Sequence, residues 1–365
     1  MQKLGTNNLI RGATFFQHAG VSIVYVFMPI LAQSLTTNIF EVGVTIASFF
    51  LAQILSSLYF GRISDASGKR LVFIKMGFIG CAVTFGLHYL ADNSFYLLLA
   101  RLGAGVTSGM MVPAMLAYTY ESGKDKSKVA SVISFHALGW LAGIVAAGIA
   151  NNEKTIFLAS AALFLAGFAV CMRLPTYAAT KETGTGLTKQ VITKNRYLFL
   201  SLLLRHVGAT SVWTILPLVL TQTLGAKLYE VSMVYVANTA SAFILMNLMG
   251  TKIMTKNITK FKIGIGLTVF VFAGMALMTE WWMAIPCMAL VGVTWAFLYI
   301  GGSIHLMENN PKSTSTGIFN STISIANVIG PVVAGTIAFY YNQAAVIYFA
   351  VGICIVAFFA SLKMK

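Results

Sequence analysis

Two arginines and three histidines inside long apolar runs of this sequence belong to residue types that can bind an anion or carry a proton. The arginines are Arg101 and Arg205, and the histidines are His18, His136 and His206. A cation within a membrane-spanning segment costs about 2.5–3.5 kcal/mol on insertion scales, which makes it a candidate for function. A histidine, with an unperturbed pKa of about 6.5, can carry a proton. We interpret the arginines as anion-binding candidates and the histidines as proton carriers. The alternatives are hydrogen-bonded packing residues and, for Arg205, a side chain that snorkels to the membrane surface.

Carboxylates and catalytic motifs are missing from the centres of these runs. All ten acidic residues fall at the ends of runs or between them, so no carboxylate is placed to carry a proton in mid-membrane. There is no His-Glu-x-x-His and no Gly-x-Ser-x-Gly, the motifs that a metalloprotease or a serine hydrolase would carry. The four cysteines lie inside apolar runs without metal-ligand spacing. We therefore expect no catalytic residue, no metal and no cofactor.

Polar side chains recur at helical spacing in the first run and form a stripe in the eleventh, and the seventh and tenth runs offer further polar and aromatic ones. Such a stripe either lines water or bonds a neighbouring helix, and the sequence leaves both open. Two buried cations without a buried anion favour an anionic or electron-rich ligand, whereas aromatic and Met-rich walls suit an amphipathic one. The ligand-binding candidates are His18, Tyr25, Arg101, Arg205, His206, Trp213, Trp295, Tyr299, Asn320 and Asn327.

The runs that hold these residues are long enough to cross a bilayer. The chain is 58% hydrophobic and only 10% charged, with a mean hydropathy of +0.80, whereas soluble domains carry about 25% charged residues. We count twelve runs of about 20 residues, and in lipid such runs must be helices. They lie at 9–34, 41–60, 71–91, 94–119, 128–150, 155–174, 197–224, 228–250, 261–279, 281–307, 314–341 and 344–362.

An internal repeat organises the runs into two halves. QSLTTNIFEV at residues 33–42 returns as QTLGAKLYEV at residues 222–231, and the same offset carries Gly61 onto Gly250. Each repeat holds six runs, an even number, so both halves cross the membrane in the same direction. The sequence therefore predicts an all-α membrane protein with two parallel six-helix halves, residues 1–174 and 197–365. A polar segment, residues 175–196, joins them as a linker.

Positive charge predicts the orientation. With Met1 inside, 21 of the 25 basic residues fall on the cytoplasmic side, as the positive-inside rule requires. Both termini are then cytoplasmic, and we expect the protein in the cytoplasmic membrane. The formal charge of +15 is spread over the loops, which indicates contacts to anionic lipid head groups and not to nucleic acid.

The segment between the second and third runs resembles a known family. GRISDASGKR at 61–70 resembles the signature loop of the major facilitator superfamily, and RLGAGVTSGMMVPA at 101–114 is similar to that family's fourth helix. We expect the two glycines of the loop to permit a tight turn. The resemblance implies a twelve-helix fold and a conformational latch on the cytoplasmic side. The latch candidates are Gly61, Arg62, Asp65, Gly68 and Arg70. Met254 stands where Asp65 would repeat, so the latch should be stronger in the N-terminal half.

The fifth run adds a second likeness. SFHALGWLAGIVAAG at 134–148 is similar to the glycine-rich fifth helix of the family's antiporters, which carries Gly-Pro where this chain has Gly139-Trp140. Gly-Pro stands instead in the eleventh run. Small residues let membrane helices approach closely. The helix-packing candidates are Gly105, Gly109, Gly139, Gly143, Gly330 and Pro331.

Together these resemblances imply a secondary active transporter that moves a small molecule by alternating access, as a monomer. The glycine-rich fifth helix points to proton-coupled efflux of drugs or metabolites. Uptake or exchange of an organic anion held by Arg101 and Arg205 stays open, as does facilitated diffusion without a coupled ion. The expected partners are a small-molecule substrate, a proton and the lipid bilayer.

Overall fold

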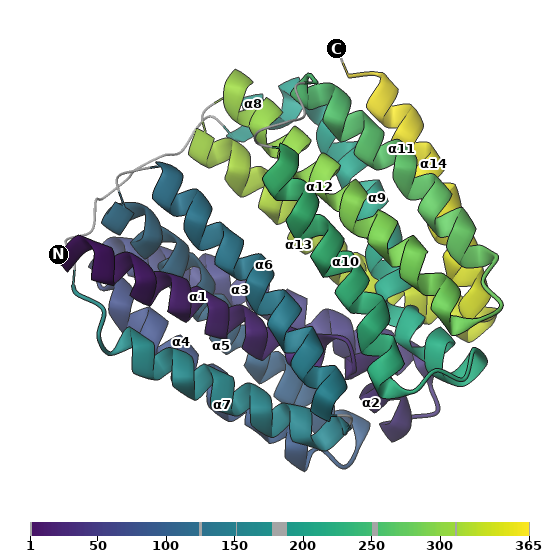
Figure 1. Cartoon of the computed structure of the whole chain (residues 1–365), viewed down its shortest axis with the longest axis horizontal. Helices are drawn as coiled ribbons and strands as arrows, with labels where there is room; N and C mark the ends of the chain where they lie inside the picture. Colours follow the sequence, from purple (N-terminus) through teal and green to yellow (C-terminus); the bar gives the residue numbers. More distant parts are fainter. Residues whose placement is uncertain are drawn as a thin grey trace. The chain divides into compact units, whose positions relative to one another are not determined.

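The computed structural model describes residues 2–123, 126–150, 152–176, 188–249, 255–310 and 312–364, and all regular structure in this part of the chain is helical. Figure 1 shows the helices in chain order. The helices of the first half are α1 Gln2–Tyr25, α2 Met28–Leu35, α3 Ile39–Ser67, α4 Arg70–Leu87, η1 His88–Leu90, α5 Ser94–Gly123, α6 Lys126–Ala150 and α7 Glu153–Cys171. Those that follow are α8 Thr188–Lys194, α9 Arg196–Leu218, η2 Val219–Thr223, α10 Leu228–Met249, α11 Asn257–Ala276, η3 Trp281–Met283, α12 Ala284–Asn309, α13 Lys312–Tyr340 and α14 Gln343–Leu362.

The predicted membrane-spanning character is confirmed, and the exact number of spans stays a prediction. Within the described ranges, ten helices are long and apolar enough to cross a membrane, or eleven if α1 and α2 form one bent span. Those two helices meet at an angle of 42° just before Pro29, where a proline removes a backbone donor. Within the described residues, the fifth run contributes the shorter apolar stretch Phe135–Ala150.

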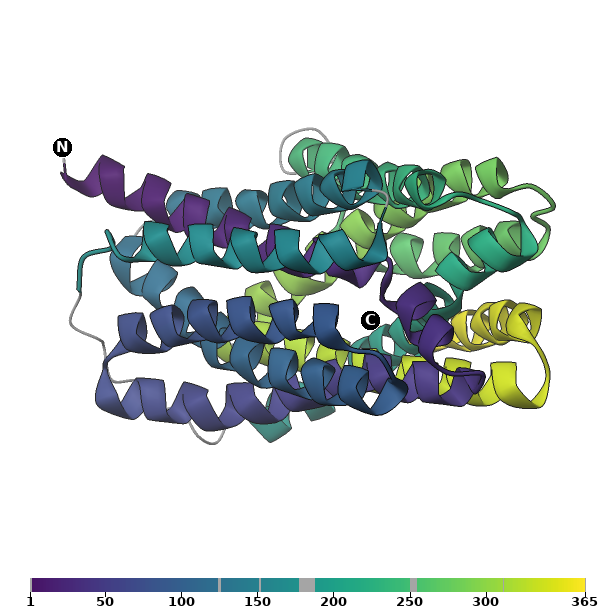
Figure 2. The same cartoon turned by 90° about the horizontal axis from the view of Figure 1, so that it is seen from below.

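Contacts divide the chain into two units. The N-terminal unit comprises Met1–Thr37 and Ser48–Thr183, and the C-terminal unit comprises Asn38–Ala47 and Gly184–Lys365. The short segment Asn38–Ala47, the start of α3, belongs to the C-terminal unit because Gly43 packs against the backbone of Pro331 in α13. In Figure 2 the helices of the N-terminal unit run alongside one another.

The two units use the same helix pairings. In the N-terminal unit α1 packs on α6 and α7, and α4 packs on α5 and α7. In the C-terminal unit α9 packs on α13 and α14, and α11 packs on α12 and α14. Counted by their order in each half, these are the same four pairs. The internal repeat seen in the sequence is therefore a repeat of packing.

Glycines stand at equivalent contacts in the two units. Gly105 of α5 faces the carbonyl of Phe49 in α3, and Gly292 of α12 faces the carbonyl of Asn238 in α10. A side chain at either glycine would collide with that backbone. Close approach of this kind is how helices associate without a hydrophobic driving force in lipid.

A second repeated contact joins the first and fifth helices of each half. The Ser22 hydroxyl of α1 donates to the carbonyl of Gly139 in α6 over 3.4 Å, and the Ser211 hydroxyl of α9 donates to that of Gly330 in α13 over 3.0 Å. Gly143 lies one turn further along α6, against Ser22 and the Ala19 carbonyl. The glycines singled out in the sequence thus lie where helices touch.

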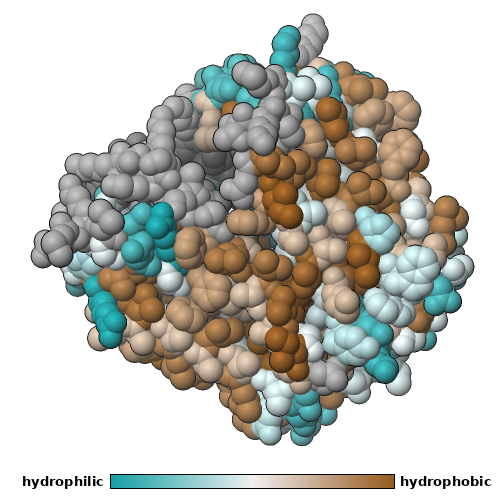
Figure 3. Space-filling view, in the orientation of Figure 1, coloured by the Kyte–Doolittle hydropathy of each residue, from teal (hydrophilic) through white to brown (hydrophobic). Residues whose placement is uncertain are grey.

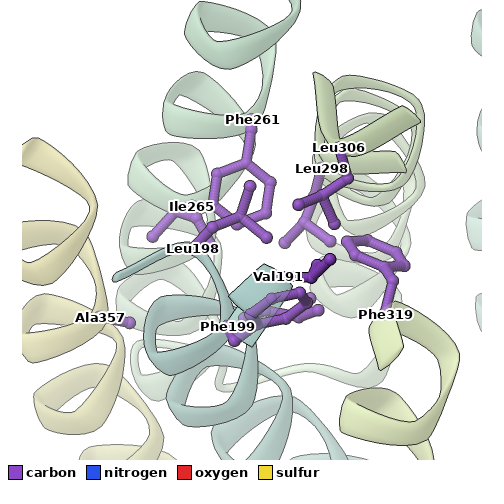
Figure 4. Packing of buried hydrophobic residues seen from close by; sticks show 10 residues of the cluster. Val191, Leu198, Phe199, Phe261, Ile265, Leu298, Leu306, Phe319 and Ala357 are labelled. Atoms are coloured by element: carbon purple, nitrogen blue, oxygen red, sulfur yellow. The ribbon is translucent and has the colours of Figure 1, made fainter. Parts of the chain in front are cut away.

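The apolar core of the C-terminal unit includes part of the predicted linker. Figure 4 shows Val191 of α8 among Phe199, Phe261, Leu298 and Phe319, and Val191 is only 3% exposed. A hydrogen bond from Lys194 Nζ to the carbonyl of Asn309 (3.0 Å) also holds α8. The end of segment 175–196 is therefore packed against this unit. Its residues 177–187 lie outside the described part of the chain.

The helix sides carry the hydrophobic surface. In Figure 3 hydrophobic residues cover the flanks of the helices, and hydrophilic ones gather towards the helix ends. Exposed large apolar side chains such as Leu55, Ile149 and Phe270 are 60–79% accessible. A soluble protein would bury such residues, whereas here they are available to lipid.

Candidate functional site

Two of the predicted proton carriers meet face to face in the N-terminal unit. The rings of His18 in α1 and His136 in α6 are stacked, with centroids 3.5 Å apart and planes 7° apart. The contact depends on Gly139, whose missing side chain lets α6 approach the His18 Cβ and the Phe15 carbonyl. His18 is half-buried and His136 is exposed on the unit. Two positive charges at this distance repel by about 5 kcal/mol at an effective dielectric constant of about 20. The pair can therefore hold one proton far more easily than two.

Aromatic rings extend this pair along α1, α3 and α6. Trp140 lies one turn from His136, with ring centroids 6.5 Å apart, and Tyr25 meets Trp140 edge-on at 5.3 Å. Phe50 of α3 lies 6.4 Å from Tyr25. The Trp140 indole nitrogen is buried and has no hydrogen-bond partner among the described residues. An indole N–H in this state is a donor that a bound ligand can satisfy.

Trp140 was not among the ligand-binding residues predicted from the sequence. It was noted only as the residue that replaces a proline after Gly139 in the fifth helix. Its position one turn after His136 gave the signal, because residues four apart share a helix face.

Arg101 lies buried in α5, and no acidic side chain of the described part of the chain pairs with it. Its side chain is 3% exposed, and its guanidinium stacks over the Phe49 ring at 4.4 Å. Its Nε has no hydrogen-bond partner in the described structure. Arg101 also interacts electrostatically with Tyr25 and His88, two groups that are neutral in their usual states. We call the rings of Trp140, Tyr25 and Phe50 the aromatic wall. The N-terminal unit therefore holds a positive charge within reach of the Tyr25 end of this wall.

Arg205 has a different environment in the C-terminal unit. It is 1% exposed, and its Nε and Nη2 donate to the hydroxyls of Thr268 in α11 (3.1 Å) and Thr294 in α12 (3.2 Å). Its Nη1 lies 3.5 Å from Nδ1 of His206. The side chain therefore does not extend to the membrane surface. It ties α9 to α11 and α12 through neutral partners.

The other predicted residues of this unit form one cluster, except for Trp213. The His206 and Trp295 rings are 5.4 Å apart, and Trp295 and Tyr299 are 5.3 Å apart. From α13, Asn327 interacts with His206 and Asn320 with Tyr299. Trp213 packs elsewhere, against Tyr235 and Phe272. The third histidine is thus surrounded by aromatic and amide groups.

The signature loop is a tight turn that needs only one of its glycines. Gly68 has φ of +67° between α3 and α4, a conformation that favours glycine. Gly61 lies inside α3, because that helix continues to Ser67, and the prediction that it serves the turn is wrong. An added Cβ there would meet the ring of Pro113 in α5 at 3.7 Å. Arg62 is exposed, and the side chain of Asp65 lies outside the described part of the structure.

Arg70 forms the centre of a buried charge cluster beside this turn. Its Nε and Nη2 donate to Oε1 of Glu121 in α5 over 3.3 and 3.0 Å, and its Nη1 donates to the Ser64 hydroxyl over 3.2 Å. The side chains of Arg70 and Glu121 are only 7% and 9% exposed. The cluster joins the ends of α3, α4 and α5.

Comparison with known proteins assigns the family. The family model of the Major Facilitator Superfamily matches residues 12–316. The chain belongs to the major facilitator superfamily. It is therefore a multi-pass membrane transporter of small molecules, and not an enzyme.

Relatives with assigned names share most of the chain's length at low identity. The multidrug resistance protein MdtG of Proteus mirabilis is 24% identical, covering 93% of this chain and 90% of its own. The proton-coupled antiporter flippase LtaA of Staphylococcus saprophyticus is 23% identical over 87% and 86%. The quinolone resistance protein NorA of Staphylococcus aureus is 21% identical over 93% and 91%.

Solved structures show the same fold. The nucleoside transporter NupG superposes with a TM-score of 0.79 at 13% identity, covering 98% of each chain. The human organic anion transporter MFSD10 (TETRAN) superposes with a TM-score of 0.74 at 14% identity, covering 99% of this chain and all of its own.

Within this superfamily fold, the C-terminal unit keeps the carboxylate of the charge cluster but not its arginine. Asn257 begins α11 as Arg70 begins α4, and its amide donates to Oε1 of Glu308, the equivalent of Glu121, over 2.9 Å. Met254 and Gly250 lie outside the described residues. The N-terminal unit thus has an ion pair where the C-terminal unit has an amide–carboxylate hydrogen bond.

Proposed function

We propose that this superfamily member exports amphipathic small molecules in exchange for protons by alternating access. The observation that carries the proposal is the stacked pair of His18 and His136. All the acidic residues fall at the ends of spans or between them, so histidine is the group left to carry a proton through the apolar region.

Binding of the substrate and protonation of the pair would disfavour each other. A ligand bound along Trp140 and Tyr25 would lie one turn from the His136 ring. A cationic or strongly polarised ligand would disfavour a charge on the pair, and a protonated pair would disfavour such a ligand. Mutual exclusion of this kind couples two binding events, and the coupling is reciprocal. Arg11 of α1, whose guanidinium lies 5.6 Å from the centroid of the Phe135 ring, adds a positive charge to the same unit.

The aromatic wall favours flat, amphipathic substrates. Trp140, Tyr25 and Phe50 offer ring faces and edges, and the free indole N–H offers one directional contact. The names of MdtG and NorA, which refer to multidrug and quinolone resistance, and that of LtaA, a proton-coupled antiporter, support export coupled to protons. We further propose a monomer in the cytoplasmic membrane, with both termini on the cytoplasmic side.

A second candidate is uptake or exchange of an organic anion at Arg101. The buried, unpartnered Nε of that residue favours it. An anion there would gain charge-assisted hydrogen bonds. Arg205 contributes less to this candidate, because its donors are already bonded to Thr268 and Thr294. The name of the structural neighbour MFSD10, an organic anion transporter, is compatible with it.

The test uses purified protein in liposomes that enclose a pH-sensitive dye. We would challenge them with norfloxacin, ethidium, uridine and p-aminohippurate, and compare the wild type with His18→Gln and His136→Gln. His305→Gln, in the last turns of α12, is the matched control. We expect norfloxacin or ethidium to change the internal pH in the wild type and the control, and not in the two pair variants.

The outcomes separate the candidates. Substrate movement without a pH change in the wild type would refute proton coupling and leave facilitated diffusion. A response to p-aminohippurate alone, lost in Arg101→Ala, would favour the organic-anion function. Full proton coupling in His18→Gln and His136→Gln would remove the histidine pair from the mechanism.

A further inference from the structure

A basic hollow opens beside the signature turn of the N-terminal unit. Its volume is about 220 Å³, and it lies where the start of α4, the end of α5 and the segment after α7 meet. Lys69, Arg70 and Lys75 line it, together with Tyr118 and Thr176, and its lining includes no acidic residue. The hollow is separate from the aromatic wall and the histidine pair.

Two of the three cations are available to a ligand. Arg70 is engaged with Glu121 and Ser64, as described above. The ammonium groups of Lys69 and Lys75 have no hydrogen-bonded or ion-paired partner in the described part of the chain. Lys69 also caps α4 without a side-chain hydrogen bond, so the positive end of that 18-residue helix opens towards the same place.

The equivalent lysines in the C-terminal unit are arranged differently. Lys256 caps α11 as Lys69 caps α4, and Lys262 corresponds to Lys75. The Lys262 ammonium, however, donates to the carbonyl of Met364 over 2.9 Å. Lys262 therefore has a hydrogen-bond acceptor within its own unit, whereas Lys75 has none in the described part of the chain.

An apolar stripe continues from the hollow along α4. Val72, at the rim, is 46% exposed, and the stripe runs on through Met76, Ile79, Val83 and Leu87, each 44–56% exposed. Steps of three and four residues keep these side chains on one helix face. A ligand whose charge enters the hollow would thus have a hydrocarbon surface beside it.

We infer that the hollow binds the phosphate group of an anionic phospholipid, with an acyl chain along the stripe of α4. Charge and shape both select this ligand. The phosphodiester supplies the anion that Lys69, Lys75 and the start of α4 lack, and the acyl chain covers side chains that water would not favour. A soluble phosphate would use the cations and leave the stripe uncovered.

The binding test uses the purified, delipidated full chain in detergent. Native mass spectrometry would count dioleoylphosphatidylglycerol and dioleoylphosphatidylcholine bound from an equal mixture. We would compare the wild type with Lys69→Gln/Lys75→Gln, with the charge-retaining Lys69→Arg/Lys75→Arg, and with Lys189→Gln/Lys256→Gln as a control for loss of two exposed lysines. The soluble head group glycerol 1-phosphate would be added in a separate series.

We expect one phosphatidylglycerol to be retained by the wild type, the arginine variant and the control. Its affinity should fall about 30-fold in Lys69→Gln/Lys75→Gln, because each lysine near an anionic lipid surface contributes about 1 kcal/mol. Equal retention of both lipids, or equal loss in the Lys189→Gln/Lys256→Gln control, would overturn the site. Displacement of the lipid by glycerol 1-phosphate at millimolar concentration would overturn its identity as a lipid site.

Discussion

Replacing Glu121 by Gln should destabilise the N-terminal unit through Arg70. The change keeps the shape of the side chain and removes its charge, so the buried guanidinium loses its counter-ion while two N–H donors still face an oxygen. The gross attraction of two charges 3.0 Å apart is about 5 kcal/mol at an effective dielectric constant of about 20. Breaking a buried pair by removing one partner costs about 3–5 kcal/mol. Because the Gln oxygen and the Ser64 hydroxyl still accept hydrogen bonds, we expect a loss near the lower end, about 3 kcal/mol.

The repeat supplies a control for this experiment. Glu308→Gln removes the equivalent carboxylate, which is exposed and whose partner Asn257 is neutral, so it should cost less than about 1 kcal/mol. Thermal unfolding in detergent, followed by loss of the monodisperse peak on size-exclusion chromatography, would compare the two. At roughly 2 °C per kcal/mol for a large chain, Glu121→Gln should lower the midpoint by about 6 °C. Equal shifts in the two variants would refute the argument that the buried charge is decisive.

Three further predictions concern single contacts. Gly143→Leu should lower thermal stability and abolish transport because the side chain would collide with α1, whereas Gly352→Leu, with nothing within 4 Å, should change the melting midpoint by no more than about 1 °C. Thr268→Val should cost about 1.5–3 kcal/mol in thermal unfolding, because a buried charged donor of Arg205 loses its acceptor; an unchanged midpoint would show that the donor finds another partner. Trp140→Phe should leave the melting midpoint unchanged, since its N–H has no partner in the described structure, and should weaken the binding of substrates that accept a hydrogen bond; unchanged substrate affinity in a fluorescence titration would argue against a ligand at that position.

Much of the fold could be predicted because membrane helices and repeats leave strong signals. Apolar runs of about 20 residues mark spans directly, and the return of residues 33–42 at 222–231 predicted two parallel halves. The bend before Pro29 was harder to foresee, because an apolar run does not show where the helix within it bends. The docking of α8 through Val191 was also missed, since one apolar residue in a polar segment has no periodicity to show.

The candidate site was predicted less completely because spacing along a helix does not fix which helix a side chain meets. His18 and His136 were named separately, and only the approach of α6 to α1 at Gly139 brings their rings together. Arg101 and Arg205 looked alike in sequence, yet one is unpartnered at Nε and the other is satisfied by two threonine hydroxyls. The difference arises from Thr268 and Thr294, which lie more than 60 residues away in the chain.

The repeat itself separates packing from chemistry. Positions whose role is contact keep their residue type in both halves, as Ser22 and Ser211 do, because each half must bring the same helices together. Positions that could bind a proton or a substrate do not keep their residue type. Counted from the matched residues Ser22 and Ser211, the equivalent of His18 is Val207 and that of Arg205 is Phe16. Counted from the matched residues Gly105 and Gly292, the equivalent of Arg101 is Met288. If these polar residues served only to hold helices together, the unit that lacks each of them should not pack in the same way, and yet the pairings of the two units are the same. Their value is therefore to be sought in what each half binds, with a proton and substrate at the N-terminal aromatic wall as the first case to test.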